Sequence, residues 1–210
     1  MSIRSNINDI KKATPNAQLV IVTKYQNLDN IKKVYNIGER EFGENKVQDL
    51  IIKRNQLAND IKWHMIGHLQ KNKVKLIAPF IYMIQSIDSI ELLKIIDQNA
   101  KKYDRTINCL IQIKIAKEIS KFGFNIEEAK VLLNSNYEEQ YKNINIKGLM
   151  GIATFTTNKE QIKKEFQQIV NILNMVKTDN PTLSIGMSND YKIAYSSGSN
   201  MIRIGSSIFK

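Results

Sequence analysis

The sequence has little of the residue types on which disulfide-bonded, metal-clustered or membrane-spanning proteins depend. Cys109 is the single cysteine among 210 residues, so neither an intramolecular disulfide nor a multi-cysteine metal cluster can form. It lies in an apolar run with Leu110 and Ile111, where we expect a small buried core residue rather than a nucleophile. No run resembles a membrane span, and the first residues lack the apolar core of a secretory signal. We therefore expect a cytoplasmic protein.

Signatures of nucleotide and nucleic-acid binding are also missing. Neither G-x-G-x-x-G nor G-x-x-x-x-G-K-S/T occurs, which removes the main dinucleotide and phosphate-loop motifs. The net charge of +11 raises the question of a nucleic-acid partner. The lysines are scattered along almost every candidate helix, however, with no basic run of five and only five arginines in the chain. We expect no specific nucleic-acid partner.

Short apolar runs alternate with longer amphipathic stretches along the whole chain, a pattern typical of βαβ units with a parallel sheet. A chain of 210 residues has room for one well-buried domain, so we expect a single domain over residues 1–210. Eight strands are predicted, with helical spacing in the segments between them. Their ranges are 19–23, 41–43, 63–66, 82–85, 107–113, 146–150, 183–185 and 201–204.

Eight such units in so short a chain approach the lower size limit of a (β/α)₈ (TIM) barrel. The alternative is a doubly wound open sheet, which would usually carry a phosphate or dinucleotide loop after its first strand. Asp88, before Ser89 and Ile90, suits the start of a helix, while Gly38 and Gly198 stand where helices should end. The α/β barrel is therefore the predicted fold class.

Lys24 is the first candidate functional residue, because the catalytic and binding residues of such barrels lie at the carboxyl ends of the strands. Alternation places it on the same side as Val20 and Val22. Desolvation at the end of a buried strand would lower the pKa of its amine and make it available for a Schiff base. The alternative is a lysine that only begins a loop and points to water.

The end of the chain carries both halves of a phosphate site of the kind that barrels build after strands seven and eight. Ser188 stands where a short helix could begin, and Gly205 and Ser206 follow the eighth strand. Arg203 alternates with isoleucines and is predicted to point inward, where a buried guanidinium needs a partner. The alternative for Arg203 is a structural ion pair with an acid on a neighbouring strand.

Several long motifs, in order through nearly the whole chain, give a resemblance to the pyridoxal phosphate homeostasis proteins, the YggS-like family also called PROSC. They are V-T-K at 22–24, F-G-E-N-K-V-Q at 42–48, W-H-M-I-G-H-L-Q-K-N-K at 63–73, Q-S-I-D-S at 85–89, S-K-F-G-F at 120–124, G-L-M-G-I-A-T at 148–154, G-M-S-N-D at 186–190 and G-S-N-M-I-R-I-G-S-S-I-F at 198–209.

The resemblance implies a barrel of the alanine-racemase type (fold type III) that holds pyridoxal 5′-phosphate (PLP). It implies that Lys24 carries the cofactor as an internal aldimine. It further implies that Arg203 lies near the pyridine nitrogen, where a cation would weaken the cofactor as an electron sink. The remaining implied site residues surround the phosphate (Ser188, Gly205, Ser206) or line the pocket (Asn45, Met150). The sequence departs from the family at Ser206, commonly threonine, and near Lys114, often asparagine.

The function implied by the resemblance is a carrier without catalytic turnover, which buffers PLP and hands it to apoenzymes as a monomer. The alternative is an amino-acid racemase using the same aldimine. Racemisation needs acid/base groups on both faces of the cofactor, and racemases of this fold take the second from a domain for which this chain has no room. His64 and His68 have the spacing of a zinc helix but lack its glutamate, so no metal site is expected.

Overall fold

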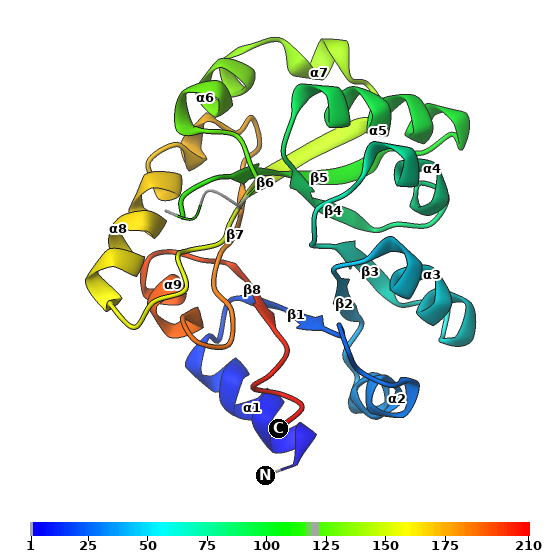
Figure 1. The fold of residues 1–210 in the computed structure, drawn as a ribbon, viewed down its shortest axis with the longest axis vertical. Helices are drawn as coiled ribbons and strands as arrows, with labels where there is room; N and C mark the ends of the chain where they lie inside the picture. Colours follow the sequence, from blue (N-terminus) through cyan, green and yellow to red (C-terminus); the bar gives the residue numbers. More distant parts are fainter. Residues whose placement is uncertain (1, 117, 119–121) are drawn as a thin grey trace.

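The computed structural model describes residues 2–116, 118 and 122–210, and within them eight parallel strands form one closed barrel in the order β1 to β8 (Figure 1). This arrangement confirms the predicted (β/α)₈ fold and excludes the doubly wound open sheet. The strands are β1 (Gln18–Val22), β2 (Glu41–Glu44), β3 (Lys62–Met65), β4 (Met83–Ile87), β5 (Ile107–Ile113), β6 (Ile144–Gly151), β7 (Thr182–Ser184) and β8 (Met201–Ile204).

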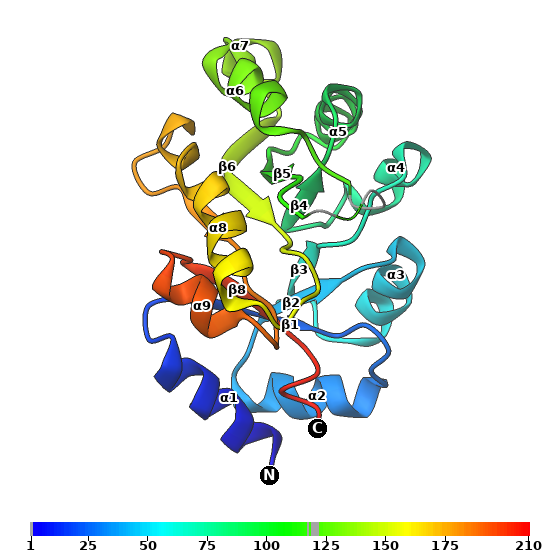
Figure 2. The same cartoon turned by 60° about the vertical axis from the view of Figure 1, so that its left-hand side comes forward.

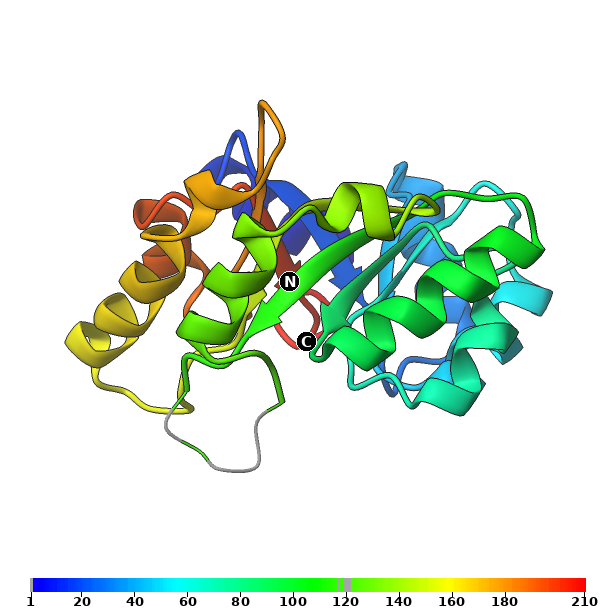
Figure 3. The same ribbon diagram turned by 90° about the horizontal axis from the view of Figure 1, so that it is seen from above.

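Helices surround the barrel on its outer side, with α8 and α5 on opposite sides of it (Figures 2 and 3). The α-helices are α1 (Ile3–Ala13), α2 (Leu28–Ile37), α3 (Val47–Gln56), α4 (Val74–Ile77), α5 (Ile90–Lys102), α6 (Ile126–Asn134), α7 (Tyr137–Gln140), α8 (Lys159–Val170) and α9 (Tyr191–Ser196). Two 3₁₀ turns, η1 (Lys71–Lys73) and η2 (Leu173–Met175), complete the connections.

The helix ends follow the residues that cap them. Gly38 ends α2 as predicted, with a left-handed φ of 111° that favours glycine. At α5 the capping residue is Ser89, whose hydroxyl accepts the Leu92 amide, and the expectation that Asp88 begins this helix is wrong. Asp88 instead accepts a hydrogen bond from the His68 ring at 2.8 Å.

The barrel has an interior layer and a larger layer between strands and helices. Val20, Met83 and Met201 belong to the interior cluster, whereas Ile202 and Ile204 pack in the layer that faces the helices. This alternation confirms that β8 turns its isoleucines outward. Cys109 is fully buried in the outer layer, as expected, and burial raises the pKa of its thiol.

Closure of the barrel brings the two ends of the sequence together. β8 pairs with β1 from Gln18↔Met201 to Ile21↔Ile204. The Asn6 side-chain amide donates to the carbonyl of Ile208 at 3.0 Å, which ties α1 to the carboxyl-terminal segment. The chain ends lie close together in both ribbon views (Figures 1 and 2). Residues at opposite ends of the sequence can therefore share a site.

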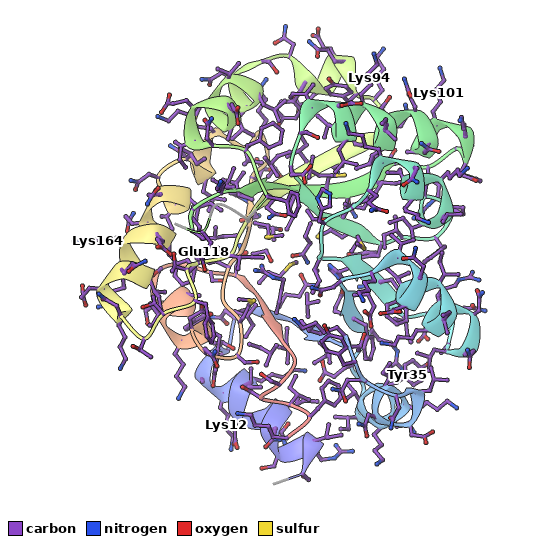
Figure 4. The ribbon with its side chains drawn as sticks, viewed as in Figure 1. Lys12, Tyr35, Lys94, Lys101, Glu118 and Lys164 are labelled. Carbon is purple, nitrogen blue, oxygen red and sulfur yellow. The ribbon has the colours of Figure 1, made fainter. Side chains whose placement is uncertain are left out.

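The positive charge is spread over the outside of the molecule. Lys12 on α1, Lys94 and Lys101 on α5, and Lys164 on α8 lie on different sides of the barrel (Figure 4). This distribution agrees with the scattered pattern in the sequence. No helix of the described residues has the length and apolar character needed to cross a membrane.

Candidate functional site

A cavity of about 250 Å³ lies at the carboxyl ends of β1, β6, β7 and β8. These are the ends at which barrels of this kind hold their working residues. Its described lining comprises Val22 and Lys24 after β1, Ala153, Thr154, Phe155, Thr156 and Ile162 after β6, Met187, Ser188, Asn189 and Asp190 after β7, and Arg203, Gly205 and Ser206 of β8 and its loop. The cavity thus gathers Lys24 with residues from the far end of the chain.

Lys24 lines this cavity but is exposed, so the expected desolvation of its amine is wrong. The physical reason is that β1 ends at Val22 and the chain turns immediately afterwards, with Tyr25 at a φ of 64°. Lys24 therefore stands at the mouth of the cavity, where both a ligand and water can reach it.

A buried ion pair fixes the backbone just before Lys24. The Lys53 ammonium donates to the Thr23 carbonyl at 2.7 Å and to a carboxylate oxygen of Glu44 at 2.5 Å. The Thr23 hydroxyl donates to the same Glu44 oxygen at 2.6 Å. Because these three side chains are buried, the peptide that leads into Lys24 is held by charge-assisted hydrogen bonds.

Ser188 lies in the loop before α9 and does not begin that helix, contrary to the prediction. The helix starts at Tyr191, because the segment before it forms a turn in which the Met187 carbonyl accepts the Asp190 and Tyr191 amides. The Ser188 hydroxyl accepts the Ser207 amide at 3.3 Å. The loop after β7 is thereby joined to the loop after β8.

Gly205 allows the loop after β8 to lie against the end of β1. A Cβ at this position would stand 3.0 Å from the Val22 carbonyl oxygen and 3.2 Å from the Val22 Cβ, tighter than almost all ordinary contacts. Glycine therefore brings Ser206 and Lys24 to the same cavity.

Arg203 is buried beneath the cavity and bonds oxygens that carry no charge. Nη1 donates to the carbonyl and the hydroxyl of Ser184, both at 2.6 Å, and Nη2 donates to the Gly151 carbonyl at 2.9 Å. The alternative of a structural ion pair on a neighbouring strand is therefore wrong. Burial lowers the pKa of the guanidinium to about 10, while the charge of Asp190 acts in the opposite direction.

Asp190 is a lining residue that sequence reasoning missed. Its Oδ1 accepts the Met187 amide at 2.6 Å, and burial raises the pKa of its carboxyl despite the Arg203 charge. Thr154 and Thr156 were missed as well. The sequence could have indicated Asp190 and Thr154 as site residues, because each is the last residue of a motif that carries the family resemblance.

Asn45 and Met150 are not among the described residues that line the cavity. Met150 is buried in the barrel interior with Val20 and Met201. Asn45 follows β2, and its buried Oδ1 has no hydrogen-bond partner in the described part of the chain. Their roles as pocket residues remain predictions. Of the S-K-F-G-F motif, Ser120 and Lys121 lie outside the described residues.

The two histidines belong to different environments. His64 is fully buried, as expected of a core residue, between Glu41 and Gln85. His68 bonds Asp88 and stacks on the Phe122 ring, with 3.8 Å between the ring centroids. Each ring is oriented by a partner of its own.

A wider groove of about 660 Å³ lies outside the barrel beside α6 and the start of α5. Three of its polar side chains already serve local structure: Ser89 caps α5, and Asn125 with Glu128 forms the capping box of α6. We consider the smaller cavity the functional one, because it gathers an amine, a buried guanidinium and hydroxyl donors.

Comparison with known proteins identifies the family of the chain. The family model of the alanine racemase N-terminal domain matches residues 1–210. The pyridoxal phosphate homeostasis protein of Helicobacter pylori is 37% identical over 195 residues, covering 92% of this chain and 87% of that protein. The Schizosaccharomyces pombe protein of the same name is 32% identical over 213 residues, covering 99% and 89%.

Solved structures give the same relationship. PipY of Synechococcus elongatus, solved with PLP bound, superposes with a TM-score of 0.88 at 27% identity, covering all of both chains. Alanine racemase of Bartonella henselae shares the fold, with a TM-score of 0.79 at 14% identity, but this chain covers 58% of it. The chain therefore belongs to the family of the pyridoxal phosphate homeostasis proteins, within the alanine racemase N-terminal domain family.

Proposed function

We propose that residues 1–210 form one domain that binds PLP in the cavity beside Lys24 and acts in PLP homeostasis and delivery without turnover of its own. The observation that carries the proposal is that a single cavity is lined by Lys24, Ser188, Arg203, Gly205 and Ser206. Support also comes from PipY, a relative whose structure contains PLP.

The donors of the cavity fit the chemistry of PLP. A phosphate dianion suits the Ser188 and Ser206 hydroxyls and the backbone beside Gly205, because hydrogen bonds to a charged group are the stronger ones. Arg203 makes three hydrogen bonds to protein oxygens, so two of its five N–H groups have no protein partner within the described residues and can serve an acceptor such as a pyridine nitrogen. When bound, PLP supplies an electrophilic aldehyde and an electron sink.

Lys24 is the residue assigned to hold the aldehyde as a Schiff base. Its Nζ would bond to the aldehyde carbon, and the aldehyde oxygen would leave as water. Because Lys24 is exposed at the mouth of the cavity, water can also return and release the cofactor. This accessibility suits a carrier that must load and unload. Asn45 and Met150 are assigned to the wall on the β2 and β6 sides.

The charges of the cavity favour a carrier over a racemase. Racemisation needs a proton donor and a proton acceptor on opposite faces of the cofactor. Among the described lining residues the titratable side chains are Lys24, Asp190 and Arg203, and the Asp190 carboxylate already accepts the Met187 amide. A guanidinium at the pyridine nitrogen also disfavours protonation of that nitrogen, which weakens carbanion chemistry. We assign the protein to the cytoplasm as a monomer that contacts apoenzymes transiently.

The first test concerns the position of the cofactor. After incubation with PLP, the chain should acquire a visible absorption band that borohydride abolishes, and peptide mass spectrometry should find the reduced adduct on Lys24. Lys24→Ala should lack both signals. Lys32→Ala on α2 is the matched control, because it removes a lysine that does not line the cavity. An adduct on another lysine would refute the assignment.

The second test separates the carrier from the enzyme. The chain loaded with PLP is incubated with single L-amino acids in D₂O, and α-proton exchange is followed by NMR. We expect no exchange above that of free PLP, because exchange needs a working base. We also expect transfer of PLP to an apo-aminotransferase faster than its release into buffer. Rapid exchange that depends on Lys24 would overturn the carrier assignment.

A further inference from the structure

A continuous row of hydrogen bonds crosses the barrel interior and ends at Arg203. Arg203 Nη1 lies 2.6 Å from the Ser184 hydroxyl, which lies 2.7 Å from Gln85 Oε1. Gln85 Nε2 lies 2.9 Å from His64 Nδ1, and His64 Nε2 lies 2.6 Å from Glu41 Oε2. The four side chains from Arg203 to His64 are buried, and the Glu41 side chain is 15% exposed.

The two end groups and the orientation of the Gln85 amide, with Oε1 toward Ser184 and Nε2 toward His64, fix the direction of every hydrogen bond in this row. A guanidinium can only donate and a carboxylate can only accept. Ser184 therefore accepts from Arg203 and must give its own proton to Gln85 Oε1. At the other end His64 must carry its proton on Nε2 to donate to Glu41, which leaves Nδ1 to accept from Gln85. The row is thus polarised from a cation to an anion, and each bond strengthens its neighbours.

Other contacts support the carboxylate end of the row. The Lys62 ammonium lies 3.0 Å from Glu41 Oε1. Burial acts to raise the pKa of Glu41, but the hydrogen bonds that its carboxylate accepts from His64 and Lys62, together with the Lys62 charge, outweigh it, so the pKa is lowered overall. Glu41 is the first residue of β2, so the row ends at the amino end of that strand. The cavity lies at the opposite, carboxyl ends of the strands.

We propose that Glu41, His64, Gln85 and Ser184 are positioning residues that hold the Arg203 guanidinium in the orientation that turns its remaining N–H groups toward the cavity. The effect on the cofactor rests on the function proposed above, whereas the fixed hydrogen-bond row is a property of the chain alone. Arg203 Nη1 donates to both the carbonyl and the hydroxyl of Ser184. The carbonyl bond alone would let the guanidinium rotate about that contact. The second bond, to the hydroxyl, fixes its orientation.

The test begins with the chain free of cofactor, labelled with ¹⁵N. The chain has two histidines, so a His68→Gln variant assigns the His64 signals. Long-range ¹H–¹⁵N correlation should find His64 as the Nε2–H tautomer, and the Arg203 Nη–H protons should exchange slowly. In Glu41→Gln the end group can both donate and accept, so we expect mixed tautomers and faster Arg203 exchange. An Nδ1–H tautomer in the unmutated chain would overturn the proposal.

Matched controls exclude a general effect of charge or cavity formation. Glu39→Gln removes a carboxylate of nearly equal side-chain exposure, 12% against 15% for Glu41, that pairs with Lys11 outside the row. Ser86→Ala removes a buried hydroxyl beside Gln85 that has no partner in the described part of the chain, and it is the control for Ser184→Ala. Both controls should keep the His64 tautomer and the Arg203 exchange rate of the unmutated chain.

The final measurement is the dissociation constant for PLP. Glu41→Gln and Ser184→Ala should each raise it about tenfold, by analogy with the loss of a group that orients a metal ligand, and the controls should not. Equal constants in variants and controls would overturn the positioning role. If the NMR signals respond as expected but the unmutated chain binds no PLP, the fixed row is supported and the proposed function fails.

Discussion

Ser188 and Ser206 reach the cavity from two different loops, which makes their hydroxyls separable by mutation. Ser188→Ala and Ser206→Ala should each raise the dissociation constant for PLP about ten- to a hundredfold, because a hydrogen bond to a charged phosphate contributes about 1.5 to 3 kcal/mol. Fluorescence or absorption titration measures this constant. Ser196→Ala on α9 is the control, since that hydroxyl bonds the Lys192 carbonyl away from the cavity.

The Ser188 variant has a second effect that must be measured separately. Its hydroxyl accepts the Ser207 amide, so the variant also loosens the contact between the two loops. Within the described residues, Ser206 makes no such contact between the loops. A loss of affinity in Ser188→Ala alone would mean that the Ser206 hydroxyl does not bind the phosphate, and unchanged affinity in both variants would mean that the phosphate binds elsewhere.

Single residues differ in how far the sequence could predict them. The inward direction of Arg203 followed from alternation with Ile202 and Ile204, which is local information. The exposure of Lys24 did not follow, because it depends on where β1 stops pairing with its neighbours. The partners of Arg203 lie on β6 and β7, and no local pattern predicts a contact between strands.

At the scale of elements, the loop that precedes α8 forms one wall of the cavity, so the start of this helix bears on binding. The Asn158 side chain caps α8 by accepting the Gln161 amide at 3.1 Å. Asn158→Ala should lower the free energy of unfolding by about 1 kcal/mol, the usual effect of losing an N-cap. It should also weaken PLP binding, because residues 153–156 line the cavity just before this cap.

Asn125→Ala provides the matched comparison. Asn125 caps α6 in the same way, accepting the Glu128 amide at 2.9 Å, but α6 contributes no described residue to the cavity. Chemical denaturation should find a similar loss of stability in both variants, and titration should find weaker binding in Asn158→Ala alone. Equal affinities would mean that the loop holds its shape without the cap.

The elements themselves were predictable to different degrees. Each predicted strand exists, because apolar runs between amphipathic segments reflect burial on both faces of a parallel strand. Strand limits depend on pairing: β6 extends to Ile144–Gly151, beyond the predicted 146–150, because both of its ends pair with β5, with one register shift between them. The start of α9 was misjudged because the Asp190 carboxylate bonds the Met187 amide and stabilises a turn there.

At the scale of the whole molecule, closure of the barrel brings residues from separate sequence motifs together in one site. Eight strands in order imply that β8 meets β1, so the proximity of Lys24 and Arg203 was predictable once the strands were counted. The hydrogen-bond row from Glu41 to Arg203 was not predictable. It joins inward side chains of β2, β3 and β4 to those of β7 and β8, and its members follow no common motif.

If the site depends on closure alone, it should survive a change in the order of its elements along the chain. The two ends lie close together and are tied by the bond from Asn6 to Ile208. A circular permutant can therefore be opened between Asp179 and Asn180, so that it begins at Asn180 and ends at Asp179. A flexible linker of about six Gly and Ser residues joins residue 210 to residue 1. Both new ends are exposed and lie before β7, at its amino end.

We expect this permutant to bind PLP with a dissociation constant within about threefold of the original, because exposed connections away from a site tolerate opening. A second permutant opened between Phe155 and Thr156 is the control, since these residues line the cavity. It should fold, as judged by circular dichroism, but bind PLP at least about tenfold more weakly, because freed loop ends must be ordered again on binding. Loss of binding in the first permutant, with its fold intact, would mean that the order of the chain and not barrel closure alone sets the geometry around Lys24.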